Sequence, residues 1–213
     1  LLLSISLSIV FGVFYYNRKT NQIYEYTDNV LLTTALSAKN ILPRDYHEKL
    51  DSVTTSSYEE IKNRFDQFAS DIQVAYIYTM IEKQGKLYYT ASNVLEGDKE
   101  KGLDTNFMQE VTTYKETIQQ SIHTNQILYF NEYESAWGSF RTVLIPIRSV
   151  VKKDYVIAVD IPIDAIELSL KKVFYESLLG DFICFLLSFC ALLPLTTKIL
   201  SKNISWDYRI KFI

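Results

Sequence analysis

Two charged residues on predicted strands could take part in ligand chemistry. Arg141 lies in the middle of GSFRTVLIPI, and Asp160 lies at the end of YVIAVD. A guanidinium group inside a strand is costly unless it reaches solvent or an anion, and its planar fork suits a carboxylate. Arg141 could instead form a structural ion pair with Asp160 or Glu134. Asp160 could instead cap the helix that follows it.

Aromatic residues close to these charges could form the wall of a pocket. Trp137 and Tyr133 precede the strand that carries Arg141. Ligand pockets usually combine an apolar lining with a few placed polar groups. An aromatic wall beside a charged group would fit that description.

Four tyrosines stand on a predicted hairpin. Because side chains alternate along a strand, Tyr76 and Tyr78 share a face, while Tyr88 and Tyr89 point in opposite directions. Most tyrosines of a sheet belong to the core or to an amphipathic surface, which is the alternative for each of them. The candidate ligand-binding residues are Arg141, Asp160, Trp137, Tyr133, Tyr78 and Tyr89.

The sequence gives little support for catalysis, a metal or a cofactor. His47 lies in a polar loop and His123 near a helix end, and neither is close to a nucleophile or an acidic constellation. The sequence contains no HExxH, GxSxG, P-loop or CxxC motif. Cys184 and Cys190 both lie in one apolar stretch, where simple packing explains them. The net charge of −3 offers no basic surface for a nucleic acid.

Two apolar, nearly uncharged stretches bracket the chain, at residues 1–16 and 178–197. About 20 apolar residues in a helix can cross the ~30 Å hydrocarbon core of a bilayer. We expect 178–197 to be a transmembrane helix and 1–16 to be the end of a longer one that begins upstream. A cleaved signal peptide is the alternative for 1–16, but no basic region precedes the run and no small-residue cleavage site follows it.

The flanks of the second stretch predict its orientation. Residues 198–213 contain four basic side chains against one acid, Asp207. Basic residues next to a span favour the cytoplasmic side. We therefore expect a cytoplasmic tail at 198–213, an extracytoplasmic domain at 17–177, and a multi-pass protein of the plasma (inner) membrane.

The residues between the two stretches predict an α+β domain. Residues 17–40 contain no Gly or Pro and form a long helix that Pro43 terminates. Ser57 and Glu60 form a capping box for a second helix. The order of elements then predicts a five-stranded antiparallel sheet with helices at its edges. The expected strands are 74–82, 86–92, 127–134, 138–149 and 154–163, and the expected later helices are 104–123 and 164–176.

Three passages of this domain resemble the Cache sensor domains, PAS-like modules of bacterial chemoreceptors, sensor histidine kinases and diguanylate cyclases. They are VAYIYTMIEKQGKLYYTAS at 74–92, ESAWGSFRTVLIPIRS at 134–149 and DYVIAVDIPIDAIELSL at 154–170. The order of these blocks, the long first helix and the two spans match the layout of that family. The length fits one PAS-like lobe better than two.

The resemblance implies a homodimeric membrane sensor that binds a small molecule in a pocket above the sheet. Asp160 resembles the aspartate that holds a ligand amine in some members, so an amino acid or an organic acid is the expected ligand. The family's cytoplasmic output domain is missing from these 213 residues. The alternative is a two-span anchor whose domain binds a protein partner without signalling. An extracytoplasmic enzyme would lack a catalytic constellation.

Overall fold

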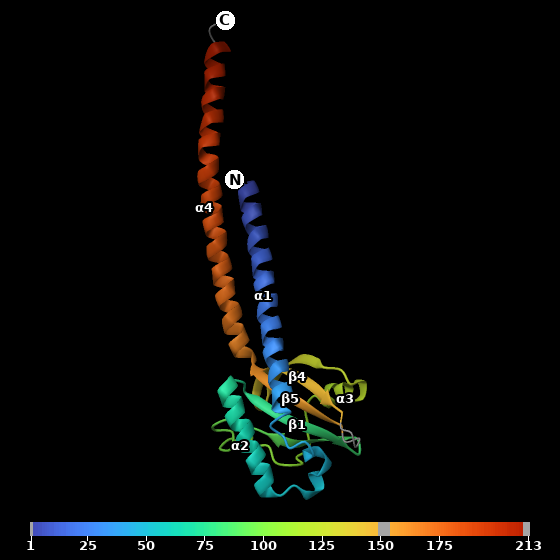
Figure 1. Cartoon of the computed structure of the whole chain (residues 1–213). Helices are drawn as coiled ribbons and strands as arrows, with labels where there is room; N and C mark the ends of the chain where they lie inside the picture. Colours follow the sequence, from blue (N-terminus) through green and yellow to red (C-terminus); the bar gives the residue numbers. More distant parts are fainter. Residues whose placement is uncertain (1, 149–153, 211–213) are drawn as a thin grey trace. The chain divides into compact units, whose positions relative to one another are not determined.

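The computed structural model describes residues 2–148 and 154–210 (Figure 1). It contains two compact units, one formed by Tyr24–Glu167 and the other by Leu1–Ile23 together with Leu168–Ile213. The ends of the predicted strand at 138–149 and of the predicted tail at 198–213 lie outside the described residues. The unit Tyr24–Glu167 contains the sheet and the candidate site.

The sheet has five antiparallel strands in the order β2-β1-β5-β4-β3 (Figure 1). The α+β class and the single antiparallel sheet expected from the sequence are confirmed. The ends of each strand lie within a few residues of the predicted bounds. The bounds could be predicted because turn residues such as Gly85, which has a positive φ, mark where strands end. The strands are β1 Tyr76–Lys83, β2 Lys86–Ser92, β3 Leu128–Ser135, β4 Gly138–Ile147 and β5 Tyr155–Pro162.

The two faces of the sheet pack against different helices. On one face, Ile77, Val143 and Val159 join a core with Leu31 of α1 (Leu2–Ala38) and Phe65 of α2 (Thr55–Ile72). On the other face, strand residues join a smaller core with Ile118 of α3 (Lys115–Thr124). These strand residues are Met80, Leu87, Leu144, Val156 and Ala158. The period of two along each strand divides the apolar residues between the two cores.

The helices before the sheet start and stop where local chemistry dictates. The predicted helix 17–40 is part of α1, which ends at Ala38, ahead of Pro43. Helix α2 has a capping box, but its members are Thr54 and Ser57 rather than Ser57 and Glu60. Thr54 has the extended backbone that an N-cap requires, whereas Ser57 is already helical.

The predicted helix at 104–123 is wrong for its first half, since α3 begins only at Lys115. Residues 93–114 instead form a long irregular segment, which we call the cover loop. Its backbone binds along the edge strand β2, where Met108 N donates to Tyr89 O at 2.8 Å and Val111 N donates to Leu87 O at 2.9 Å. Pairing with an exposed strand edge outweighs the helix propensity of these residues.

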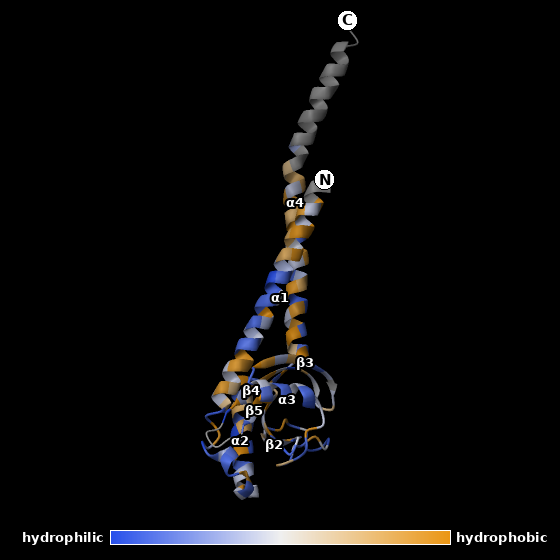
Figure 2. Cartoon of the chain, turned by 90° about the vertical axis from the view of Figure 1, so that its right-hand side faces the viewer, coloured by the Kyte–Doolittle hydropathy of each residue, from blue (hydrophilic) through white to orange (hydrophobic). Residues whose placement is uncertain are grey.

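The second unit contains the apolar ends of α1 and α4 (Ile163–Ile210). Within it, Ser177 Oγ donates to the Gly12 carbonyl at 3.0 Å, and the Asp181 carboxyl occupies the space that a side chain at position 12 would need. Among the described residues, one helical stretch is long and apolar enough to cross a membrane, Ile163–Ala191 (Figure 2). It overlaps the predicted second span at 178–197, while a span at 1–16 stays a prediction.

A buried histidine fixes the turn between α1 and α2. The His47 ring stacks on Tyr155 with 3.6 Å between centroids, and its Nε2 lies 3.0 Å from Thr90 Oγ1. His47 is 4% exposed. Burial lowers its pKa to about 3, so the ring is neutral in the folded protein at neutral pH.

We expect His47 to make the folded state sensitive to acid. Its folded pKa lies below the unfolded value of about 6.5, so its contribution is complete above that pH and declines as pH falls toward 3. Between pH 6.5 and 4.5, the protein should lose on the order of 2 kcal/mol more unfolding free energy than His47→Gln. Denaturant titrations of both proteins at the two pH values test this. Equal losses would show that His47 is charged or accessible in the fold.

Candidate ligand-binding site

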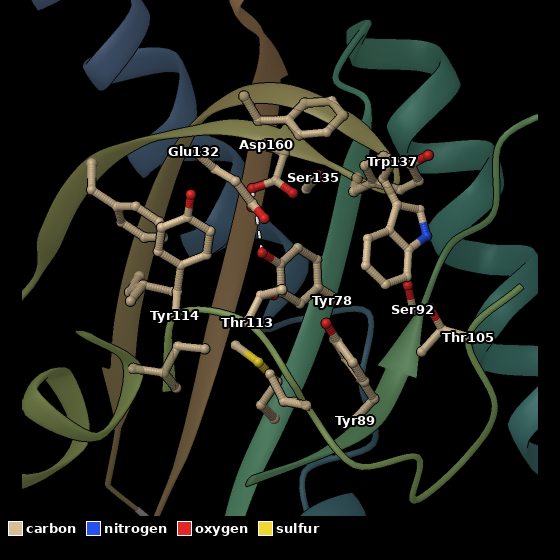
Figure 3. Close-up of a pocket in the computed structure, with 17 residues that line it drawn as sticks. Tyr78, Tyr89, Ser92, Thr105, Thr113, Tyr114, Glu132, Ser135, Trp137 and Asp160 are labelled. Atoms are coloured by element: carbon tan, nitrogen blue, oxygen red, sulfur yellow. Dashed lines mark hydrogen bonds between the residues drawn. The ribbon is translucent and has the colours of Figure 1, made fainter. Parts of the chain in front are cut away.

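A cavity lies on the face of the sheet that packs against α3 (Figure 3). All five strands contribute to its wall, and the cover loop and α3 contribute the rest. About 40 Å³ of the cavity is open to the centres of water molecules, which is room for a few waters. Its aromatic wall consists of Tyr76, Tyr78, Tyr89, Tyr114, Phe130, Trp137 and Phe140.

Asp160 is the most unusual polar group in this cavity. It lies in the central strand β5 and is 4% exposed. Thr142 Oγ1 donates to its Oδ1 at 2.7 Å, and the Tyr78 hydroxyl donates to the same oxygen at 3.4 Å. Oδ2 accepts no hydrogen bond from the described residues. One oxygen of a buried carboxyl is therefore available to a ligand.

Burial raises the pKa of Asp160 to about 8, although the bonds from Thr142 and Tyr78 favour the ionised form. The charge of Glu132 acts in the same direction as burial. Asp160 is therefore mostly protonated at neutral pH in the empty domain. A ligand that brings a positive charge or strong donors would favour its ionisation.

Glu132 is a second carboxyl in the same cavity. It lies on β3, is 7% exposed, and points toward Asp160 and the Tyr78 hydroxyl in Figure 3. Burial raises its pKa, while the neighbouring Ser135 hydroxyl acts in the opposite direction. The cavity thus holds two buried acids, and no Lys, Arg or His is among the described residues that line it.

Side chains of the sheet and of α2 hold the first half of the cover loop in place. The Tyr76 hydroxyl donates to Asp98 at 2.9 Å, and Trp137 Nε1 donates to the Leu103 carbonyl at 2.9 Å. Tyr58 of α2 donates to the Thr105 carbonyl at 2.8 Å. Asp98 lies in a run of charged residues at 98–101, yet it is 5% exposed because the Tyr76 hydroxyl and the Leu95 amide donate to its carboxylate.

Four of the six predicted site residues line the cavity. Asp160 comes from β5, Tyr78 from β1, Tyr89 from β2 and Trp137 from the turn between β3 and β4, and the four converge there (Figure 3). Tyr78 and Tyr89 meet edge to face, with 5.7 Å between ring centroids. Asp160 does not cap α4, because its carboxyl accepts its side-chain hydrogen bonds from Thr142 and Tyr78.

Arg141 and Tyr133 are not among the residues that line this cavity, so the structure does not bring them together with the other four. Thr142 points at Asp160, and alternation along β4 sends its neighbour Arg141 to the face that packs against α1. Tyr133 is 59% exposed, and its hydroxyl accepts a hydrogen bond from Asn131 at 3.0 Å. Tyr133 follows Glu132 directly in β3, so the two side chains point to opposite faces of the sheet.

Arg141 forms a structural ion pair, as one reading of the sequence allowed, but with an unforeseen partner. Its Nε and NH2 each bind one oxygen of Asp28 in α1 at 2.8 Å, and NH1 donates to Asn131 at 3.0 Å. The guanidinium also lies over the rings of Tyr24 and Tyr129. The hydrogen bonds that Arg141 donates to Asp28 raise the pKa of the guanidinium.

Glu132 and Thr142 are site residues that the sequence reading missed. A signal for Glu132 was present, because it has the same strand parity as the apolar Leu128 and Phe130. An acid on the apolar face of a strand is expensive without a purpose. No comparable signal existed for the cover loop, whose position depends on tertiary pairing.

We expect the Arg141–Asp28 pair to be energetically coupled. The side chains are 17% and 26% exposed, and the pair is bidentate, so a coupling of about 1–2 kcal/mol is expected. A double-mutant cycle with Arg141→Ala and Asp28→Ala, measured by denaturant unfolding, gives this value. Additive effects of the two substitutions would contradict a stabilising pair.

Asp160→Asn should stabilise the empty protein. The raised pKa of Asp160 means that its contribution is complete below about pH 4 and is lost as pH rises through about 8. At pH 7 the variant should gain on the order of 4 kcal/mol, and the gain should vanish near pH 4. Unfolding curves at both pH values measure it. A variant that is less stable at pH 7 would show that the carboxylate is ionised and well paired.

Comparisons with known proteins bear on the fold of this domain. No family model matches the chain, and no curated protein matches it. Among solved structures, the ligand-binding domain of the Campylobacter jejuni chemoreceptor Tlp3 in complex with L-norvaline matches with 14% identity and a TM-score of 0.52. The match covers 80% of this chain and 64% of that one. The same domain with L-valine gives 15% identity, 78% and 63% coverage, and a TM-score of 0.50.

The chain therefore spans slightly less than two thirds of the Tlp3 domain. The sensor domain of the V. cholerae histidine kinase DctB also matches, with 16% identity over 73% of this chain and 60% of that one and a TM-score of 0.42. At these identities the likeness concerns the fold. The chain has the fold of the sensory domains of bacterial receptors, which agrees with the Cache-like architecture expected from its sequence.

Proposed function

We propose that this protein is a membrane-anchored sensor whose domain at 24–167 reversibly binds a small molecule in the cavity around Asp160. The observation that carries the proposal is the carboxyl of Asp160, which is buried with one oxygen unpaired and facing a cavity. Such a group lowers the stability of the empty fold, so its presence is best explained by a ligand. The likeness to ligand-binding sensory domains supports the same function.

Ligand binding would require the cavity to expand. Its open volume suits a few waters, and a metabolite would displace them and shift the cover loop. The loop supplies Thr105, Val111, Thr113 and Tyr114 to the wall. Hydrogen bonds from Tyr76 and Trp137 link the cover loop to the sheet, so a shift of the loop would change both of these contacts.

Two connections would carry a change from the sheet toward the membrane. Asp160 lies on β5, which runs directly into α4 at Ile163. Arg141 on the adjacent β4 binds Asp28 of α1. A ligand that moves β5 relative to β4 would therefore shift the equilibrium between two arrangements of α1 and α4. The size of this shift is limited by the difference in the ligand's affinity for the two arrangements.

The anchoring in this proposal uses two spans, residues 1–16 in α1 and 178–197 in α4. The apolar stretch Ile163–Ala191 supports the second, and the basic residues at 198–213 favour a cytoplasmic tail with the domain outside. A homodimer through α1 is part of the proposal, supported by Tyr26 and Leu36, which are 72% and 48% exposed on that helix. The output would be carried by a cytoplasmic domain or partner beyond these 213 residues.

A metabolite screen on the full chain in detergent tests the sensing function. A ligand present at 100 times its dissociation constant adds about 2.7 kcal/mol, which raises the melting temperature by about 5–10 °C in a protein of this size. Tyr78→Phe should reduce the shift, because it removes a hydroxyl from the cavity. The matched control Tyr133→Phe removes one outside the cavity and should keep the full shift.

Two results would contradict the proposal. One is a folded protein that no amino acid, amine, carboxylate or purine stabilises, which favours an anchor that binds a protein partner. The other is a stabilising ligand whose effect is equal in both tyrosine variants, which places binding elsewhere.

A further inference from the structure

The cavity around Asp160 is unusual in its charge balance. Asp160 on β5 and Glu132 on β3 are separated by one strand, yet both side chains reach into the same space (Figure 3). They are 4% and 7% exposed. The described lining residues include no basic side chain. Ionising both buried acids without a cation is costly, because their charges would repel each other and are poorly solvated.

The protein's own donors satisfy this pair only in part. Both donors to Asp160, Thr142 and Tyr78, bind its Oδ1, which leaves Oδ2 free toward the cavity. The Ser135 hydroxyl donates to the Gly138 carbonyl at 2.7 Å and, as a hydrogen-bonding neighbour, also favours the ionised form of Glu132. Free acceptor capacity remains on the carboxyls for the N–H groups of a ligand.

The same cavity is poorly suited to a carboxylate. The guanidinium expected to bind one, Arg141, lies on the opposite face of the sheet and is held by Asp28. A ligand carboxylate would find only neutral donors, such as hydroxyl groups, among the described lining residues. Its charge would also oppose the ionisation of both acids, so nothing in the lining compensates a buried negative charge.

The walls add an attraction for positive charge. Tyr78 and Tyr89 stand edge to face, and Trp137 lies near them on the side of the cover loop (Figure 3). The faces of such rings attract ammonium groups when water is excluded. Acids and aromatic faces together thus favour the same class of ligand.

We infer that the cavity is a cation-selective site in which Asp160 and Glu132 jointly hold an ammonium or amidinium group of a ligand that lacks a carboxylate. The inference rests on the proposed sensor function and specifies its ligand class. It departs from the amino acid or organic acid expected at first, because that expectation required Arg141 in the same pocket. It also assigns Glu132 a role in selecting the ligand.

Proton release accompanies binding at this site. A cation favours the ionised form of Asp160, whose pKa burial raises to about 8 in the empty cavity. Aliphatic amines stay positively charged at pH values up to and somewhat above this pKa. Affinity for them should rise by up to tenfold per pH unit as pH approaches 8 and should level off above it.

The chain contains a reporter for the experiment. It has two tryptophans, and Trp137 lines the cavity. In the full chain with Trp206→Phe, in detergent, the fluorescence of Trp137 is followed during titration with amino acids and their decarboxylated amines. Suitable pairs are valine with isobutylamine, leucine with isoamylamine, and lysine with cadaverine. Acetate and neutral isobutanol are included as probes of the other ligand classes.

We expect at least one amine to bind at least 30-fold more tightly than its parent amino acid. Glu132→Gln should weaken that amine at least tenfold, and Asp160→Asn should abolish its binding. Glu100→Gln, on the exposed part of the cover loop, is the matched control and should leave the affinity unchanged. Thermal unfolding of each variant verifies that it is folded.

Different failures have different meanings. If amino acids or acetate bind more tightly than the amines, and Asp160→Asn abolishes this binding, the sensor function stands and the cation selectivity is wrong. If Glu132→Gln leaves amine binding unchanged, the joint role of the two acids is wrong. If none of the probes, nor any compound of the wider screen, binds the folded protein, the proposed function fails with it.

Discussion

The alternation of side chains along five antiparallel strands is the constraint on which the rest of this domain depends. It places Thr142 on one face of β4 and Arg141 on the other, so two residues adjacent in the chain serve different structures. One face carries the cavity, with Asp160, Glu132 and Tyr78. The other carries the main core and the Arg141–Asp28 ion pair that joins the sheet to α1. A shift of one residue in register would exchange these environments.

The energetic character of the two faces follows from their polar groups. On the α1 face, Arg141 meets a bidentate carboxylate, an amide and two aromatic rings, so its charge is compensated. On the cavity face, Asp160 and Glu132 are both buried and both have raised pKa values. The first arrangement stabilises the fold, whereas the second costs stability in the empty state. Polar groups retained at such a cost typically mark function.

The sequence predicted correctly those helices and strands that have a strong hydrophobic periodicity. Its predictions were wrong where tertiary contacts determine the local structure. The five strands follow from alternating β-branched and aromatic residues, and Pro43 marks the limit of the first helix. The helix expected to start at Asp104 failed because residues 106–111 bind the edge of β2. A sequence contains no direct sign that this edge is free to pair.

The candidate site shows the same division. Tyr78, Tyr89, Trp137 and Asp160 were identified from residue type and position, and they line one cavity. Arg141 was assigned to it because a guanidinium in a strand needs an anion, but the sequence could not say which one. Asp28 lies more than a hundred residues away in the chain. Thr142 is the residue of β4 that pairs with Asp160, so Thr142 shares its face of the sheet and the neighbouring Arg141 points to the other face. This pairing would have excluded Arg141 from the cavity, but the register between the two strands is known only from the structure.

A crystal structure of the protein with a bound amine would decide which face of the sheet is the ligand face. If it is the face that carries Asp160, electron density for the amine will contact Asp160 Oδ2 and Glu132, with the Arg141–Asp28 pair intact. Density for the ligand beside Arg141, with Asp28 displaced, would place binding on the opposite face and rule out the cavity as the ligand site.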